Sequence, residues 1–325
     1  MSIIIAGSVR SFVSESKSVH FEFDSGKAIS NNKNFLEENF LNESFISCIG
    51  IIEANSFFNS SYIYSNFSLD ENEEYSRSDL DNILEHVWGP LHVFQLSLWF
   101  VKDNNVNVEQ LYLYDLKTEL VVKSKRNVWA SNARGRYEDS RFTIEELKNA
   151  LEWKEKILKY LELDEMPEAE VHNSSGVRYR NRSAQTPYAE LNRVSRALRF
   201  IMVGRYESFL PMKISAYVGA LEALFSTTKS EVTHQVAERA VKMLGGDIET
   251  RLSNYTLIKN VYDIRSMYVH GSEIKEKALN KAVDLMKDFD ELIRNVLKVI
   301  IEKYPNLSEM KLNELDLFFK KLILQ

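Results

Sequence analysis

The sequence predicts an α+β chain, in which a mixed α/β N-terminal part is followed by an all-α C-terminal bundle. Before position 143, short apolar runs alternate with polar stretches rich in Asn, Ser and Gly. After position 187, apolar residues recur at helical spacing, and glycines or prolines mark the ends of the segments. The length of 325 residues is enough for two hydrophobic cores. We therefore expect three parts: residues 1–142, a helix and linker at 143–186, and the bundle at 187–325.

The first 76 residues are expected to form strands and loops. Residues 19–23 alternate in hydropathy and the next four supply turn residues, which predicts a hairpin. The apolar run 45–54 predicts a buried strand, whereas the Asn- and Ser-rich stretches 30–34 and 55–68 predict loops.

The next segments predict both helices and strands. Ser78 is a candidate cap for a helix that runs to about residue 86, before Gly89 and Pro90 interrupt the chain. Residues 111–114 and 119–123 predict two strands.

A capping box marks the start of the helical part. Thr143 and Glu146 occupy its N-cap and N3 positions, and apolar spacing extends this helix to about residue 163. A loop or linker follows to residue 186. The bundle helices are expected over about 187–210, 211–225, 230–244, 248–270, 275–303 and 308–324, joined by short connections that favour antiparallel packing.

Composition narrows the class of protein. Cys48 is the one cysteine, so an internal disulfide and a cysteine-based zinc site are excluded, and we expect a cytoplasmic protein. The longest apolar stretch, 91–101, is much shorter than the ~20 residues of a membrane helix, so no membrane partner is expected. The net charge is −6, yet residues 190–325 carry 21 basic against 18 acidic side chains. The bundle is therefore the better candidate for contacting nucleic acid.

The most informative stretch is 262–271, where Arg265 and His270 lie five residues apart before Gly271. Glycine commonly ends a helix in the left-handed conformation. Five residues turn an ideal helix by about 500°, so the two side chains diverge by about 140°. A guanidinium beside an imidazole suits proton transfer next to a phosphate. The structural alternative is an arginine that binds helix-end carbonyls and a histidine that packs near the turn.

The order of several segments resembles a known family. Glu222 lies within Ala-Leu-Glu-Ala-Leu, Glu231 follows, then Arg239 within Glu-Arg-Ala, then Arg265 and His270. Over roughly residues 187–300 this order is similar to the Apea-like subgroup of HEPN domains. The resemblance implies a metal-independent endoribonuclease, without a cofactor, in which the ribose 2′-hydroxyl attacks the phosphate. It implies that Arg265 binds the scissile phosphate and that His270 is the general base or acid.

The resemblance also implies partners and a biological role. It implies RNA, including tRNA, as substrate, and a homodimer formed through the C-terminal bundle. It further implies antiphage defence by abortive infection, with an N-terminal domain that senses a phage-derived trigger or ligand.

Four further residues are candidate supporting groups. Ser266 lies four residues before His270, so its hydroxyl is expected to reach the imidazole. Asp263 either orients that ring or lies on a solvated helix face. Glu222 and Arg239 form either a partly buried ion pair that fixes the packing or a contact that shapes the site at Arg265.

A cluster of arginines precedes and enters the first bundle helix. It is interleaved with Tyr179 and Tyr188 and is a candidate RNA-binding surface. The alternatives are a basic solvent face or a face that docks on the acidic N-terminal part. Its members are Arg178, Arg180, Arg182, Arg193, Arg196 and Arg199, followed by Arg205.

Two other functions remain open on the sequence. A HEPN-like bundle without catalysis would bind a nucleotide, RNA or a protein. The chain could also be the toxin of a toxin–antitoxin pair.

Overall fold

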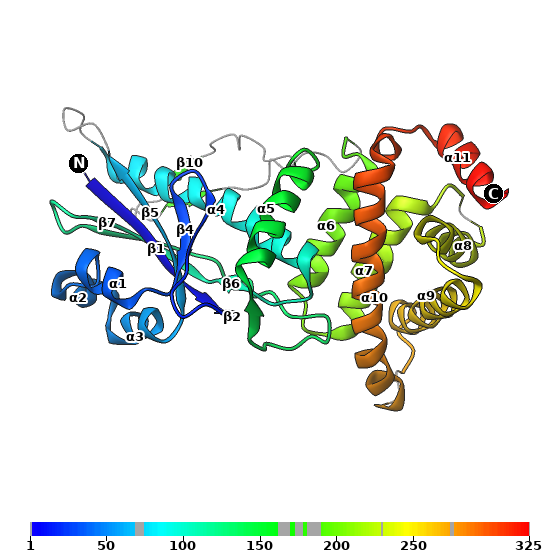
Figure 1. The fold of residues 1–325 in the computed structure, drawn as a ribbon, viewed down its shortest axis with the longest axis horizontal. Coiled ribbons are helices and arrows are strands. Elements are labelled where there is room, and N and C mark those ends of the chain that lie inside the picture. Colours follow the sequence, from blue (N-terminus) through cyan, green and yellow to red (C-terminus); the bar gives the residue numbers. More distant parts are fainter. Residues whose placement is uncertain are drawn as a thin grey trace.

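The computed structural model describes residues 2–68, 75–161, 170–172, 178–180, 190–228, 230–273 and 276–324. A β-sheet with its helices forms one end of an elongated molecule, and a helical bundle forms the other (Figure 1). The two ends of the chain lie at opposite ends of the long axis (Figure 1). The chain is therefore α+β, with its helical part at the C-terminal end, as the sequence predicts.

The main sheet is antiparallel, and β1 (Ser2–Arg10) lies inside it between two neighbours. The strand order is β3-β4-β5-β1-β7-β8, and the short β6 also pairs with β1. The predicted hairpin is confirmed as β3 and β4, with Gly26 at a φ of +67° in the turn. The other strands are β3 (His20–Asp24), β4 (Lys27–Ser30), β5 (Ser61–Ser68), β6 (Asn107–Val108), β7 (Gln110–Asp115) and β8 (Val121–Lys125).

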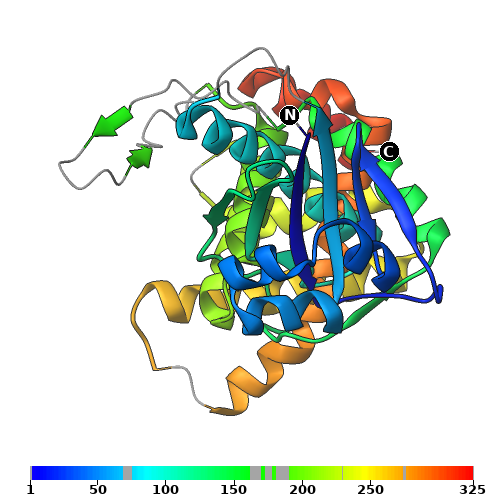
Figure 2. The same ribbon diagram turned by 90° about the vertical axis from the view of Figure 1, so that its left-hand side faces the viewer.

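The alternation along β1 sends side chains to both faces of the sheet. Ile3 and Ile5 belong to the core under α4 (Arg77–Val101), whereas Ile4 and Ala6 belong to the core under three short helices. Because both faces are buried, the strand contains a continuous apolar run. Figure 2 looks onto this end of the molecule, with the three short helices in front of the strands.

The prediction of a buried strand at 45–54 is wrong, because this run forms two helices. The helices on this face are α1 (Lys33–Asn39), α2 (Glu43–Ile49) and α3 (Ile51–Asn59). The side chain of Asn42 accepts a hydrogen bond from the Phe45 backbone N–H at 2.8 Å, which caps α2. Gly50, at a φ of +89°, then separates α2 from α3. The predicted loop 55–68 is also wrong, because it contains the end of α3 and the whole of β5.

The helix α4 continues through Pro90, where the sequence predicts a break. Its N-cap is Ser76, two residues before the expected Ser78, and Asp79 completes a capping box. Residues 91 and 93–100 are all buried, since α4 contributes to the core under the sheet and to the core of the bundle. Packing on both sides therefore outweighs the loss of one backbone hydrogen bond at the proline.

The capping box at Thr143 and Glu146 is confirmed, and it starts α5 (Ile144–Leu158). Short strands lie on either side of this region. They are β2 (Phe12–Ser14), which pairs with β9 (Ser140–Phe142) in parallel, and β10 (Glu170–His172), which pairs with β11 (Arg178–Arg180).

The bundle helices agree with the predicted ranges to within a few residues at most ends. The first of them starts at Arg193, and its expected start at 187 lies outside the described residues. The bundle core also takes in side chains of α4 and α5. The elements are α6 (Arg193–Arg205), α7 (Leu210–Phe225), α8 (Val232–Leu244), α9 (Ile248–Val269), α10 (Glu276–Lys303), a 3₁₀ turn (Pro305–Ser308) and α11 (Leu312–Leu324). Among the helices of the described ranges, none combines the length and the apolarity needed to cross a bilayer.

Candidate functional site

Arg265 lies beside an open hollow of about 540 Å³ between α7, α8 and α9, here called the Arg265 hollow. Hydroxyl groups contribute much of its wall, together with the side chains of three acidic or basic residues. The lining residues are Glu222, Ser226, Thr228, Val232, Thr233, Tyr262, Asp263, Arg265 and Ser266. The three candidates Asp263, Arg265 and Ser266 are therefore brought together with Glu222 in one place.

The nearest acidic partner of Arg265 is Glu222, with Nη2 and Oε2 3.8 Å apart. The two side chains are 35% and 28% exposed. An ion pair of this length and exposure contributes little to stability, at most about 1 kcal/mol. The Arg265 guanidinium is therefore available to an incoming anion.

Tyr262 forms part of the wall next to this pair. Burial raises the pKa of Tyr262 strongly, and the charge of Glu222 raises it further. The phenol consequently stays protonated at all physiological pH values. It can donate a hydrogen bond but cannot serve as a base.

His270 lies at the end of α9 and does not line the Arg265 hollow. Its backbone N–H donates to the Ser266 carbonyl oxygen at 3.1 Å, and Gly271 ends the helix at a φ of +68°. The side chain is exposed. Five residues advance an ideal helix by about 7.5 Å and turn it by about 140° beyond one turn, so Arg265 and His270 diverge within one subunit.

The expected contact between the Ser266 hydroxyl and the His270 ring is not formed. Within the described residues these two are joined through the backbone, not through their side chains. Ser266 and Asp263 are both exposed and face the Arg265 hollow. Asp263 adds a second carboxylate to Glu222 there, so this side of the site is not strongly attractive to phosphate by itself.

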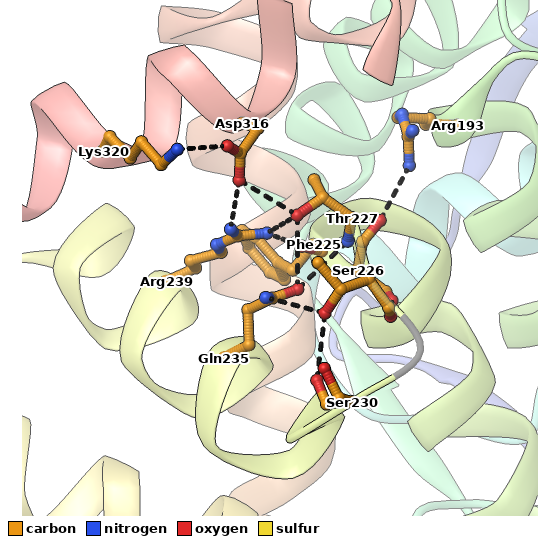
Figure 3. Close-up of polar contacts among 10 residues, drawn as sticks. Arg193, Phe225, Ser226, Thr227, Ser230, Gln235, Arg239, Asp316 and Lys320 are labelled. Atoms are coloured by element: carbon orange, nitrogen blue, oxygen red, sulfur yellow. Dashed lines mark hydrogen bonds and ion pairs between the residues drawn. The ribbon is translucent and has the colours of Figure 1, made fainter. Parts of the chain in front are cut away.

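Arg239 does not pair with Glu222, and the interpretation of these two as an ion pair is wrong. Only 4% of Arg239 is exposed, and its guanidinium lies 4.6 Å from the centre of the Phe319 ring. Nη1 donates to the Phe225 carbonyl oxygen at 2.6 Å and to Thr227 Oγ1 at 2.9 Å, and Nη2 donates to Asp316 Oδ1 at 3.1 Å (Figure 3). Arg239 thus fixes the segment after α7, whose neighbours Ser226 and Thr228 line the Arg265 hollow.

Arg193 and Arg196 line a second hollow of about 310 Å³, here called the Arg193 hollow. Glu222 and Ser226 line both hollows, so the two adjoin at the end of α7. Arg193 Nη1 donates to the Ala223 carbonyl oxygen at 3.2 Å. It also donates to the Ser226 carbonyl oxygen at 3.4 Å (Figure 3). Burial, and then the charges of Arg196 and Arg239, lower the pKa of Arg193, although a guanidinium stays charged at neutral pH.

The remaining arginines of the predicted surface differ in position. Arg199 is partly exposed on α6 but does not line the Arg193 hollow. Arg178 and Arg180 belong to β11, and Arg182 lies outside the described residues. Arg205 is buried, with Nη1 3.0 Å from the Asn104 carbonyl oxygen, so its inclusion in a surface cluster is wrong.

The hydroxyls of Ser226, Thr228 and Thr233 line the Arg265 hollow but were not predicted as part of the site. The run Ser226-Thr227-Thr228 directly after α7 is the signal that points to the first two, whereas Thr233 belongs to α8. In the described part of the chain, no group of three or more His, Cys, Asp or Glu side chains is arranged to hold a metal ion. Comparisons with protein-family models, with curated proteins and with solved structures gave no match.

Proposed function

We propose that the chain is a metal-independent endoribonuclease of the HEPN type that acts as a homodimer. The observation that carries the proposal is the position of Arg265, a weakly paired guanidinium facing an open hollow that adjoins Arg193 and Arg196. Three guanidinium groups around two adjoining hollows are suited to a chain of phosphates.

Arg265 would exchange Glu222 for a phosphate on binding RNA. A phosphate offers two oxygens to the planar guanidinium fork, whereas Glu222 lies 3.8 Å away. The carboxylates of Glu222 and Asp263 in the Arg265 hollow repel phosphate. We therefore expect RNA to enter from the side of Arg193 and Arg196. The scissile phosphate would then reach Arg265 last.

A second subunit is required, because Arg265 and His270 diverge within one chain. The surface beside His270 is apolar: Phe209, Met212 and Val269 are exposed, and the Phe209 ring packs on Tyr268 with centroids 5.8 Å apart. The end of α9 and the start of α10 also project from the body of the molecule (Figure 2). A clustered, projecting apolar surface suits contact with a second copy. Across a two-fold axis, His270 of one subunit would approach Arg265 of the other.

The reaction would be a transesterification without a metal. His270 accepts the proton of the ribose 2′-hydroxyl, the 2′-oxygen forms a bond to phosphorus, and the bond to the 5′-oxygen breaks. The leaving oxygen takes up a proton and becomes a 5′-hydroxyl, while the other product carries a 2′,3′-cyclic phosphate. Arg265 stabilises the charge that develops on the phosphate oxygens.

Antiphage defence by abortive infection is the biological role we propose for this activity in the cytoplasm. The support is the resemblance of the motif order. A strain that expresses the chain should restrict phage plating, and a strain that expresses His270→Ala should not.

A second candidate function is a binding module that holds RNA or a nucleotide without cleaving it. It is favoured by one observation, that His270 does not line the hollow that Arg265 faces. In that case Arg265→Ala would weaken RNA binding. The wild type, Arg265→Ala and His270→Ala would all give the same background level of RNA cleavage.

The decisive experiment incubates purified chain with total RNA and labels new 5′-hydroxyl ends. Arg265→Ala and His270→Ala should each abolish the signal. Arg251→Ala, at the other end of the same helix, and His86→Ala, an exposed histidine of α4, are matched controls that should keep it. Full cleavage by His270→Ala would refute the catalytic role.

Mixing the two inactive variants tests the composite site. In a random mixture half of the dimers are mixed, and one of their two sites has both residues intact. About a quarter of the wild-type activity should therefore return. No recovery, while the wild type remains active, would refute a site shared between subunits.

A further inference from the structure

A third hollow lies in the sheet part of the molecule, close to the junction with the bundle and far in the sequence from the proposed nuclease site. It has a volume of about 310 Å³ and is here called the Trp129 hollow. The end of β1, the end of α3, β6 and the segment 129–139 contribute to its wall. The residues that carry the inference are Arg10, Asn107, Trp129, Tyr137 and Asp139.

Two aromatic side chains that line this hollow are exposed and do not belong to a hydrophobic core. Trp129 is 40% exposed and Tyr137 is 53% exposed, whereas Trp88, Trp99 and Trp153 are buried. The ring centroids of Trp129 and Tyr137 are 6.0 Å apart, and the planes meet at 87°. A planar ring that lies flat on one of them therefore meets the edge of the other, which is a favourable aromatic arrangement.

Asn107 supplies a buried polar group to the same hollow. The residue is 6% exposed, and its side-chain Nδ2 has no hydrogen-bond partner within the described residues. A buried amide N–H that is left unpaired is destabilising, so a native protein seldom keeps one without a use. This donor suits an acceptor atom of a ligand.

Arg10 supplies a positive charge at the edge of the hollow. Its guanidinium lies 4.9 Å from the centre of the Trp129 ring, and the side chain is 52% exposed. Arg10 pairs with Glu109 at 3.1 Å, but Glu109 also binds Lys125 at 2.8 Å. Glu109 would keep a cationic partner if Arg10 turned toward an anion.

We propose that the Trp129 hollow binds a nucleoside phosphate. The base lies against Trp129 and Tyr137, an acceptor on the base receives the Asn107 N–H, and the phosphate binds Arg10. Asp139, exposed at the rim, is placed to accept from ribose hydroxyls. A volume of about 310 Å³ lies at the small end of ligand pockets and suits one nucleotide.

The charge of Arg10 favours a nucleotide over a neutral sugar, the other class that binds exposed aromatic rings. The site does not depend on the ribonuclease proposal, since it lies on different elements and its test measures binding alone. If the chain binds no nucleotide, the nuclease proposal is unchanged. If the chain cleaves no RNA, the nucleotide-binding proposal is unchanged.

Calorimetric titration of the full chain with AMP, GMP, CMP and UMP tests the proposal. At least one should bind with a Kd below about 1 mM. Adenosine or guanosine, without the phosphate, should bind more weakly than its monophosphate. Quenching of the exposed Trp129 should follow the same binding curve.

Variants assign the contacts. Trp129→Ala and Tyr137→Ala should each weaken binding by about tenfold, as expected for loss of base stacking. Arg10→Gln should weaken binding of the nucleoside monophosphate but should leave binding of the nucleoside unchanged. Val128→Ala, an exposed neighbour that does not line the hollow, should bind within about twofold of the wild type.

Three results would overturn the proposal. The first is no binding by any nucleotide at millimolar concentration. The second is binding that neither Trp129→Ala nor Tyr137→Ala affects, although both variants melt cooperatively. The third is binding of a neutral disaccharide such as maltose in place of every nucleotide.

Discussion

Replacing Arg239 by methionine tests whether the bundle depends on one buried guanidinium. Methionine keeps an unbranched apolar side chain at this position, but it removes the guanidinium, with its contact to the Phe319 ring and its three hydrogen bonds. Each hydrogen bond to a charged group contributes about 1.5–3 kcal/mol. The Phe225 carbonyl oxygen loses a buried donor at 2.6 Å, whereas the Thr227 hydroxyl keeps Asp316 at 3.2 Å.

The contributions of these three hydrogen bonds to the free energy of unfolding are not fully additive. Asp316 keeps Lys320 at 2.8 Å and is 31% exposed, so its charge is not stranded. Arg239 Nε has no hydrogen-bond partner in the described residues, and methionine removes that unsatisfied donor as well. We therefore expect Arg239→Met to lower the free energy of unfolding by about 3 kcal/mol.

The matched control is Asp316→Asn. The amide oxygen can still accept from Arg239, and only an ion pair at a partly exposed position is lost, so the cost should be below about 1 kcal/mol. Equilibrium unfolding in urea, followed by circular dichroism, measures both variants. If Asp316→Asn costs as much as Arg239→Met, or if the latter costs less than about 1 kcal/mol, the reasoning about the buried acceptors is refuted.

Two further changes probe the contact between the sheet end and the bundle. Gly135→Ala should destabilise by more than about 2 kcal/mol, because Gly135 has a φ of +72° and an added Cβ would lie 2.3 Å from the Ser208 carbonyl oxygen; a shift in melting temperature measures it. Burial, and then Arg205, lower the pKa of Lys213 to about 7, against about 10.4 in an unfolded chain. Because unfolding then takes up a proton between pH 7 and about 10, stability should rise with pH in that interval, by at most about 5 kcal/mol. Lys213→Met should flatten this rise in melts at several pH values, and an unchanged slope would contradict the assignment.

The bundle helices were predictable because their ends carry local signals. Gly245 and Gly246 end α8, Asp247 caps α9 by accepting from the Thr250 N–H at 2.8 Å, and Gly271 follows the last turn of α9. Such caps act within a few residues, so they can be identified without knowing the tertiary structure. The apolar periodicity of the long helices adds the buried face.

The N-terminal end was harder to predict for a physical reason. A short apolar run such as 45–54 fits a buried strand and a buried helix equally well, and the cap at Asn42 decides between them. The break expected at Pro90 fails because tertiary packing on two cores stabilises α4 as a whole. The tertiary packing of α4 is not visible in the local pattern, whereas the cap at Asn42 is a local signal.

The candidate site divides in the same way. The order of motifs in the sequence suggests that Glu222 and Arg265 belong to one site. In the structure, Arg265 Nη2 lies 3.8 Å from Glu222 Oε2. The partner of Arg239 could not be predicted, because Asp316 lies 77 residues away on α11. The divergence of Arg265 and His270 does follow from helix geometry, and it makes the two-fold arrangement the critical part of the proposed function.

The junction between the sheet end and the bundle contains buried polar groups beside its apolar core. Asp290 on α10 accepts from the Trp99 Nε1–H at 2.8 Å and from the Tyr217 hydroxyl at 2.9 Å. Arg205, at the end of α6, donates to the Asn104 carbonyl oxygen at 3.0 Å. Buried groups of this kind must keep their partners, because a displaced partner leaves an unpaired dipole or charge in the interior. The junction therefore opposes sliding of the bundle against the sheet.

A single helix connects this junction with the proposed phosphate site. The first turn of α6 carries Arg193 at its hollow, and the last residue, Arg205, accepts a hydrogen bond from the Ser131 N–H at 2.7 Å through its carbonyl oxygen. Thirteen helical residues span about 20 Å. Ser131 is two residues from Trp129. One rigid helix therefore connects the segment of the Trp129 hollow with the proposed RNA site, although the two sites share no residue.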